Sequence, residues 1–111
     1  MNENGGEITD QHLGQIMQRL VNAYQPEAIY LFGSRGRDEG GPDSDYDLLV
    51  VVPSSPDPPY RRAQQAQELL WGLWDAADVL VLTRDEFDRL KTEASSIPAT
   101  VLTEGRVLYA A

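Results

Sequence analysis

Apolar residues recur along the chain with two kinds of spacing, one typical of amphipathic helices and the other of buried strands. Between Ile8 and Tyr24 they return every three or four positions, which places them on one face of a helix. We therefore expect a helix over about residues 9–24, ended by Pro26. The same spacing returns over residues 60–74 and predicts a second helix there.

Four short apolar runs have the composition of β-strands. EAIYLFG at residues 27–33 and ADVLVLT at residues 77–83 are rich in branched or aromatic side chains. DLLVVV at residues 47–52 is a continuous apolar run, which is typical of a strand buried on both faces. RVLYA, after Gly105, predicts a last short strand, and the proline-rich segment 53–59 is expected to be an exposed connection.

Two further segments complete the pattern. DEFDRLKTEA, residues 85–94, predicts a short helix capped by Thr83 or Asp85, and a helical or turn segment follows Ile97-Pro98. The elements then follow the order helix, strand, strand, helix, strand, helix, strand. Since several connections are short, this order predicts a small α/β fold with a mixed β-sheet and helices packed against it.

The composition fits one globular domain. The chain has 111 residues, 41% of them hydrophobic, and no cysteine, so we expect one modest core without disulfides or thiolate metal sites. No stretch approaches the roughly 18 apolar residues of a membrane span, so we expect a cytoplasmic protein with no membrane partner. Residues 1–8 are expected to be a disordered leader and residues 9–111 the domain.

The formal net charge is −9 at pH 7. A strongly acidic surface repels a phosphate backbone, so we expect no direct binding of nucleic acid. A small nucleotide is a different case, because divalent cations neutralise carboxylates and phosphates together.

Three aspartates have positions that call for an explanation beyond solubility. Asp45 and Asp47 are two residues apart at the start of a strand, so both side chains project to the same face. Carboxylates held this close repel each other, and a hard cation such as Mg²⁺ relieves the repulsion. An exposed turn with two solvated aspartates would carry the same short motif.

Asp78 is the third of these aspartates and opens the strand at residues 77–83. It is either a solvated strand end or, if this strand lies beside residues 47–52, a third carboxylate next to the first two. Three convergent carboxylates suit metal-dependent phosphoryl or nucleotidyl transfer.

A candidate phosphate-binding element precedes the aspartates. Gly33 and Ser34 follow a strand, where backbone N–H groups and a hydroxyl can face an anion and glycine allows its close approach. Arg35 is placed to balance the charge. Gly-Ser is common in plain turns, so its weight comes from the aspartate pair that follows ten residues later.

The combination of Gly33-Ser34, ten intervening residues and Asp45-Tyr46-Asp47 resembles the signature of the DNA polymerase β-like nucleotidyltransferase superfamily. The segment GSRGRDEGGPDSDYDLLVVV and the small size resemble its minimal nucleotidyltransferase (MNT) group. The resemblance implies ATP as the substrate and two bound Mg²⁺ ions, which Mn²⁺ can replace. It implies that the nucleotide-binding residues are Gly33, Ser34 and Arg35. It implies that the catalytic and metal-binding residues are Asp45, Asp47 and Asp78.

The resemblance also implies a function and a partner. Many MNT proteins are antitoxins of type VII toxin–antitoxin pairs, and they transfer AMP from ATP to a tyrosine of a HEPN-domain toxin. We therefore expect a protein adenylyltransferase whose partner is a HEPN toxin, in a homo- or hetero-oligomer. Two alternatives remain: an inactive nucleotide-binding antitoxin that neutralises its toxin by complex formation, and a small-molecule nucleotidyltransferase of the aminoglycoside type.

A few other side chains receive a structural interpretation. Tyr46, between the aspartates, is expected to point away from them and pack beneath the sheet. Arg61 and Arg62 are interpreted as solvated charges at the start of a helix, with contact to the triphosphate or to the partner as the alternative. Trp71 and Trp74 are interpreted as core or partner-interface residues.

Overall fold

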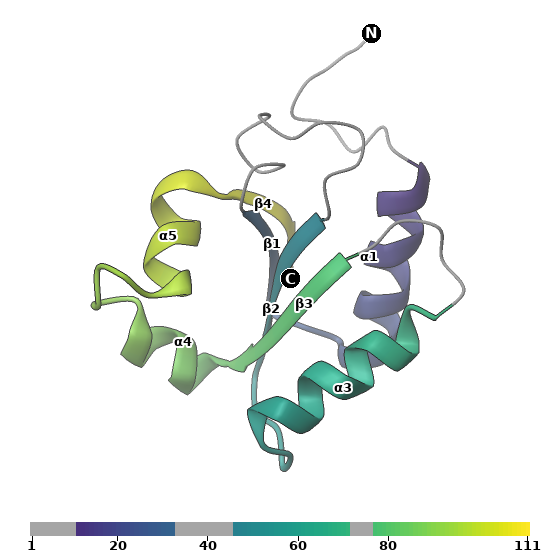
Figure 1. Ribbon diagram of the computed structural model, residues 1–111, viewed down its shortest axis with the longest axis horizontal. Helices are drawn as coiled ribbons and strands as arrows, with labels where there is room; N and C mark the ends of the chain where they lie inside the picture. Colours follow the sequence, from purple (N-terminus) through teal and green to yellow (C-terminus); the bar gives the residue numbers. More distant parts are fainter. Residues whose placement is uncertain (1–10, 33–45, 72–76) are drawn as a thin grey trace, which may run out of the picture.

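The computed structural model describes residues 11–32, 46–71 and 77–111 (Figure 1). Several predictions concern residues outside these ranges. They are the leader over residues 1–8, the nucleotide-binding residues Gly33, Ser34 and Arg35, the metal-binding Asp45, and Trp74.

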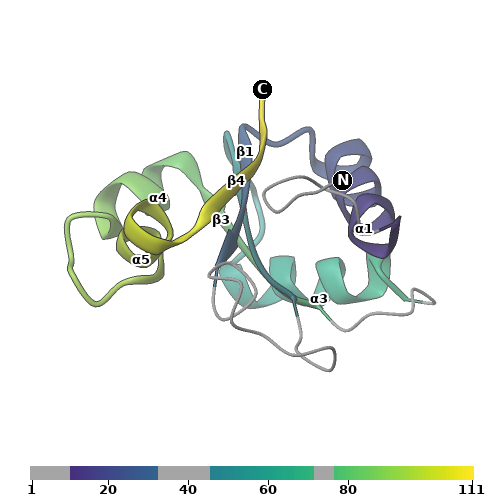
Figure 2. The same cartoon turned by 90° about the horizontal axis from the view of Figure 1, so that it is seen from above.

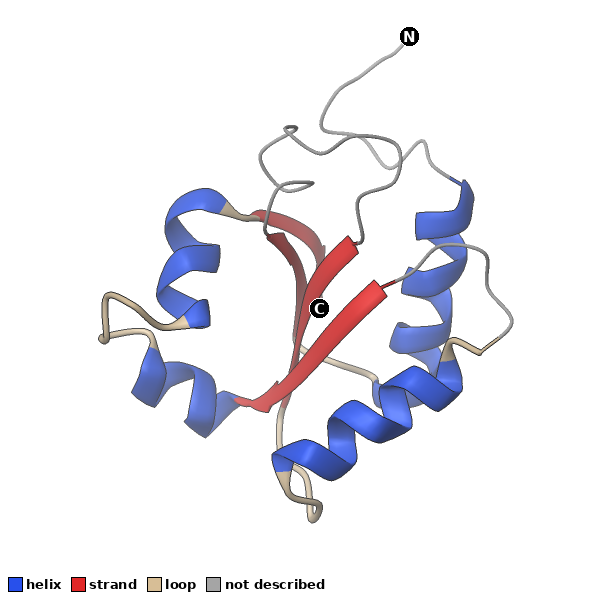
Figure 3. Ribbon diagram, viewed as in Figure 1, coloured by secondary structure: helices blue, strands red, loops and turns tan. Residues whose placement is uncertain are grey.

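The described strands form one four-stranded sheet in the order β3-β2-β1-β4 (Figure 3). β1 (Ala28–Phe32) is antiparallel both to β2 (Tyr46–Val52) and to β4 (Arg106–Ala110). β2 and β3 (Ala77–Thr83) are parallel, and α3 (Pro59–Leu69) lies between them in the sequence, as a parallel pair requires. The prediction of a small α/β fold with a mixed sheet is confirmed.

Helices cover both faces of the sheet (Figure 2). α1 (Gln11–Tyr24) and α3 lie on one face, and α4 (Arg84–Leu90) and α5 (Ile97–Glu104) lie on the other. Alternate strand residues divide accordingly between two cores. The α1 and α3 core includes Leu48, Val50, Val79 and Val81, and the α4 and α5 core includes Leu49, Val51 and Leu82. Because both faces of β2 are covered, every residue from Leu48 to Val52 is apolar.

The two longer helices follow the predicted spacing, with one difference in length. α1 ends at Tyr24, and Gln25 adopts a positive φ of 48° before Pro26. The second helix was predicted to reach residue 74, but α3 ends at Leu69, and Nη1 of Arg19 donates to the carbonyls of Leu69 and Trp71 at its end. In the described part of the chain, no helix is long and apolar enough to cross a membrane.

The predicted helix over residues 85–94 is too long at its C-terminal end. α4 ends at Leu90, and Oγ of Ser96 donates to the carbonyl of Leu90 over 2.6 Å. The same Oγ accepts a bond from the N–H of Ala99 and caps α5, so one side chain closes one helix and opens the next. The prediction that Thr83 caps α4 is confirmed, since Thr83 and Glu86 form a reciprocal capping box.

Candidate active site

Asp47 and Asp78 lie next to each other at one edge of the sheet. They are register partners in the parallel pair of β2 and β3, where neighbouring strands are about 4.8 Å apart. Asp47 lies two residues before Leu49, and Asp78 lies four residues before Leu82, so each aspartate shares a strand face with that leucine. Both leucines belong to the core under α4 and α5, so both carboxylates face this side of the sheet. Asp78 was expected to join the aspartate motif if β3 paired beside β2, and the register meets this condition.

Three strand ends meet at this edge. β1 is antiparallel to β2, so its last residue, Phe32, is paired with Asp47 near the start of β2. In the sequence, Gly33 directly follows Phe32 and Asp45 directly precedes Tyr46. The chain therefore leaves β1 and enters β2 at the edge that carries the two described aspartates.

Tyr46 has the orientation predicted from the two-residue period of a strand. Its side chain is 2% exposed and belongs to the core under α1 and α3, on the face opposite Asp47. The tyrosine thus anchors the start of β2 in the core and leaves the other face to the carboxylate.

A pocket of about 420 Å³ lies beside the two carboxylates. Its walls come from β1, from β3, from the middle of α3 and from the first residue of α5, and the residues that complete them are Phe32, Val79, Leu80, Ala63, Gln67 and Ile97. Asp78 is exposed and Asp47 is half-buried, so both can reach a bound molecule. Gln67 and Ile97 were not among the predicted site residues, although the four-residue spacing of Ala63 and Gln67 places both on one face of α3.

The residues at this edge fit a divalent hard cation. Carboxylate oxygens are the ligands that Mg²⁺ prefers, and Asp47 and Asp78 present theirs on one face beside an open pocket. Within residues 11–32, 46–71 and 77–111, no group of three or more His, Cys, Asp or Glu side chains could hold a metal ion. The third predicted ligand, Asp45, lies outside these ranges.

The family of the chain follows from its sequence. Residues 13–107 match the model of the nucleotidyltransferase domain family. The chain belongs to this family. The matched region contains Asp47 and Asp78, and the expected relationship is thereby confirmed. No curated protein matches the sequence significantly.

Solved structures share the fold of this nucleotidyltransferase domain. A candidate nucleotidyltransferase from Sulfolobus solfataricus superposes with a TM-score of 0.64 at 20% identity, over 90% of this chain and 78% of that one. A mutant of the MntA–HpeT toxin–antitoxin gives 0.60 at 24% identity, over 89% and 72%. A toxin–antitoxin with AMP-PNP gives 0.52 at 21% identity, over 94% and 75%. At these identities the likeness establishes the fold.

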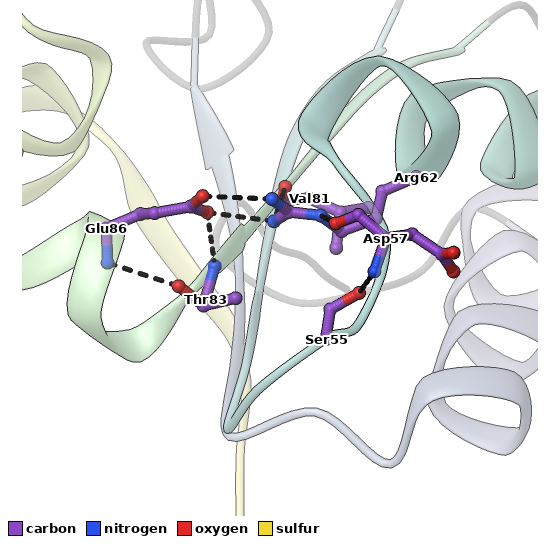
Figure 4. Close-up of polar contacts among 6 residues, drawn as sticks. All are labelled: Ser55, Asp57, Arg62, Val81, Thr83 and Glu86. Atoms are coloured by element: carbon purple, nitrogen blue, oxygen red, sulfur yellow. Dashed lines mark hydrogen bonds and ion pairs between the residues drawn. The ribbon is translucent and has the colours of Figure 1, made fainter.

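Arg62 has a different role in the nucleotidyltransferase domain from the one predicted. The interpretation as a solvated charge is wrong, because Arg62 is 3% exposed. Its Nη1 and Nη2 donate to the Glu86 carboxylate over 2.8 and 2.9 Å (Figure 4). Nη1 also donates to the carbonyl of Val81 and Nε to that of Asp57. Helical position showed where Arg62 lies on α3 but gave no sign of a partner 24 residues later.

Glu86 is held ionised by this arrangement. The bonds from Arg62 lower its pKa to about 2, partial burial opposes them, and the N–H of Thr83 assists them. The pair lies near the end of β3, whereas Asp78 lies near its start. Arg62 and Glu86 therefore hold the domain together at a distance from the candidate site.

The exposure of Trp71 distinguishes between its two predicted roles, a core residue and a partner-interface residue. Its side chain is 85% exposed, so the core interpretation is wrong for this residue, and the interface interpretation remains a prediction. Trp74, the other member of the pair, lies outside the described residues.

Proposed function

We propose that this nucleotidyltransferase domain, over residues 9–111, transfers AMP from ATP to a tyrosine hydroxyl of a protein and depends on Mg²⁺. The observation that carries the proposal is the pairing of Asp47 and Asp78 on one face of the sheet, beside an open pocket. Family membership supplies the class of reaction. The choice of a protein acceptor rests on the resemblance to MNT proteins.

In this proposal the aspartates bind the metal ions, and the glycine-serine pair binds the phosphates of ATP. Asp45, Asp47 and Asp78 would hold two Mg²⁺ ions, or Mn²⁺ in their place, and the bound ions would neutralise charge on the triphosphate. The N–H groups and the hydroxyl of Gly33 and Ser34 would bind the phosphates, as such groups do after a strand. The guanidinium of Arg35, the third predicted nucleotide-binding residue, would balance the remaining charge.

The reaction is an in-line displacement at the α-phosphorus of ATP. The tyrosine oxygen forms a bond to this phosphorus while the bond to the bridging oxygen of pyrophosphate breaks. The phenolic proton passes to the carboxylate of Asp78, which is exposed and can release it to water. The products are an AMP–tyrosine phosphodiester and pyrophosphate.

A HEPN-domain toxin in the cytoplasm is the proposed partner. Two of the similar solved structures are toxin–antitoxins, and one of these contains the ATP analogue AMP-PNP. Their fold covers about nine-tenths of this chain, which supports the proposal of a similar assembly. The nucleotidyltransferase would then act as the antitoxin within a hetero-oligomer.

An antitoxin that acts by complex formation alone is the second candidate function. The high exposure of Trp71 favours it, because tryptophan is enriched among the residues that dominate binding interfaces. Under this alternative, substitution of Trp71 by alanine would abolish neutralisation of the toxin, and substitution of the aspartates would not.

The proposal is tested by radiolabel transfer. The purified chain is incubated with Mg²⁺, a HEPN-domain toxin as the proposed acceptor, and ATP labelled at either the α- or the γ-phosphate. We expect the α label, and not the γ label, to enter a tyrosine of the acceptor. Asp45→Asn and Asp47→Asn should abolish this labelling while circular dichroism and melting show an intact fold.

The matched control is Glu93→Gln, which removes an exposed carboxylate from the connection between α4 and α5. Its labelling should equal that of the unmodified protein. Undiminished labelling by the two aspartate variants would refute the assignment of the site. Absence of labelling combined with full neutralisation of the toxin would favour the second candidate function.

A further inference from the structure

The candidate pocket extends beyond the two carboxylates onto two helices from opposite sides of the sheet. Ala63 and Gln67 belong to α3, and Ile97 is the first residue of α5. The pocket lies where the strand ends meet, since Phe32, Asp47 and Asp78 come from β1, β2 and β3, and β3 is an outer strand of the described sheet.

The order of the strands indicates which of the two substrates, ATP or the acceptor, approaches from the β3 side. β2 carries Asp47 and lies between β1, which leads in sequence to the proposed phosphate-binding residues, and β3, which carries Asp78. In an in-line displacement the attacking oxygen and the leaving pyrophosphate lie on opposite sides of the reacting phosphorus. If the triphosphate is held from the β1 side, the acceptor must approach from the β3 side.

The chemistry of the wall suits an acceptor that has both an apolar body and polar atoms. Ile97 is 38% exposed, and Phe32 and Leu80 add apolar surface on the same face as the carboxylates. Gln67 is exposed, and a glutamine amide both donates and accepts hydrogen bonds. A volume of about 420 Å³ lies in the lower part of the usual range for ligand pockets and suits one large side chain.

We propose that Gln67 and Ile97 determine the specificity for the acceptor. Ile97 packs against the ring of the acceptor side chain, and the amide of Gln67 bonds to polar atoms of the acceptor backbone. This assignment rests on the proposed transfer to tyrosine. Neither residue contacts the nucleotide, so the two helices select the acceptor independently of ATP.

The first experiment measures binding without catalysis. N-acetyl-L-tyrosinamide is titrated into the isotope-labelled chain while NMR follows the side-chain amide of Gln67 and the methyl groups of Ile97. Both signals should shift on addition of this probe and stay in place on addition of Mg²⁺ with a non-hydrolysable ATP analogue. Signals that follow the nucleotide alone, or that follow neither compound, overturn the inference.

The second experiment separates binding of the acceptor from the chemical step. In the transfer assay, Gln67→Ala and Ile97→Ala should each raise the acceptor KM by about three- to tenfold, with kcat and the KM for ATP unchanged. Gln64→Ala, an exposed glutamine on the same helix that does not line the pocket, is the matched control and should change nothing.

The outcomes distinguish this inference from the proposed function. If AMP is transferred and neither variant changes the acceptor KM, the inference fails and the function stands. If the tyrosinamide shifts both signals but no AMP is ever transferred, the acceptor site stands and the proposed reaction fails.

Discussion

Arg62 and Glu86 form an ion pair that joins helices on opposite faces of the sheet. Arg62 belongs to α3 and Glu86 to α4, so their contact of 2.8 Å passes around the outer side of β3 near its end (Figure 4). The guanidinium also bonds to the carbonyl of Val81 within β3. One side chain thus connects the strand to the helices on both of its sides.

Arg62→Met is expected to lower the free energy of unfolding by about 3 kcal/mol, because it removes one partner of a largely buried ion pair. Arg61→Met is the matched control, since Arg61 is the neighbouring arginine and is exposed. Its effect should stay within about 0.5 kcal/mol. Urea denaturation of the two variants measures the difference, and equal losses of stability would contradict the role assigned to Arg62.

The same ion pair predicts a specific acid sensitivity. The pKa of Glu86 is about 2 in the folded protein, against 4.5 for an unperturbed glutamate, so its stabilisation is complete above about pH 5 and is lost as the pH falls toward 2. Glu86→Gln should therefore be less stable than the unmodified protein at pH 7, and the difference should shrink between pH 5 and pH 2. Urea denaturation at several pH values measures it. A difference that stays constant over this range would disprove the linkage.

Asp78→Asn is expected to lower the rate of AMP transfer by about 10²- to 10⁴-fold, because the amide cannot take the proton of the acceptor hydroxyl. The isolated fold should be retained, since Asp78 is exposed. Single-turnover measurements of pyrophosphate release check the rate, and thermal melting checks the fold. A variant that releases pyrophosphate at the unmodified rate would exclude Asp78 from the reaction.

Gly105→Ala is expected to destabilise the protein by about 1–3 kcal/mol, because the added Cβ would lie 2.8 Å from the carbonyl oxygen of Val101 and 2.9 Å from that of Leu31. Gly14→Ala in α1 makes the same chemical change where nothing lies within 4 Å. That variant should be more stable by about 1 kcal/mol, since alanine favours the helix. Thermal unfolding of both proteins compares them, and effects of the same sign would contradict the packing at Gly105.

The sequence predicted the sheet well because its strands have a strong apolar signal. β3 has the predicted bounds, and the orientation of Tyr46 follows from the two-residue period of a strand. The adjacency of Asp47 and Asp78 depends on which strands pair, so it could be predicted only under the condition that β3 lies beside β2. The relationship to nucleotidyltransferases came from motif spacing, and the family match confirmed it.

Interactions between distant residues escaped prediction for a physical reason. The burial of Arg62 depends on Glu86, and the end of α4 depends on Ser96, whose hydroxyl reaches back to Leu90. Local periodicity carries no information about such partners. The pocket residues Gln67 and Ile97 are brought together by the packing of two helices around β3, and no motif connects them.

The bond from Arg62 to Val81 has a consequence for the chemistry at the other end of the strand. A slip of β3 by a single residue along β2 would turn Asp78 to the opposite face, because successive side chains of a strand alternate. The guanidinium opposes such a slip, because it bonds to the backbone carbonyl of Val81 within β3. This bond does not depend on the identity of the Val81 side chain. Arg62 thus helps to keep Asp47 and Asp78 aligned, although it lies at the opposite end of β3 from the proposed substrate site.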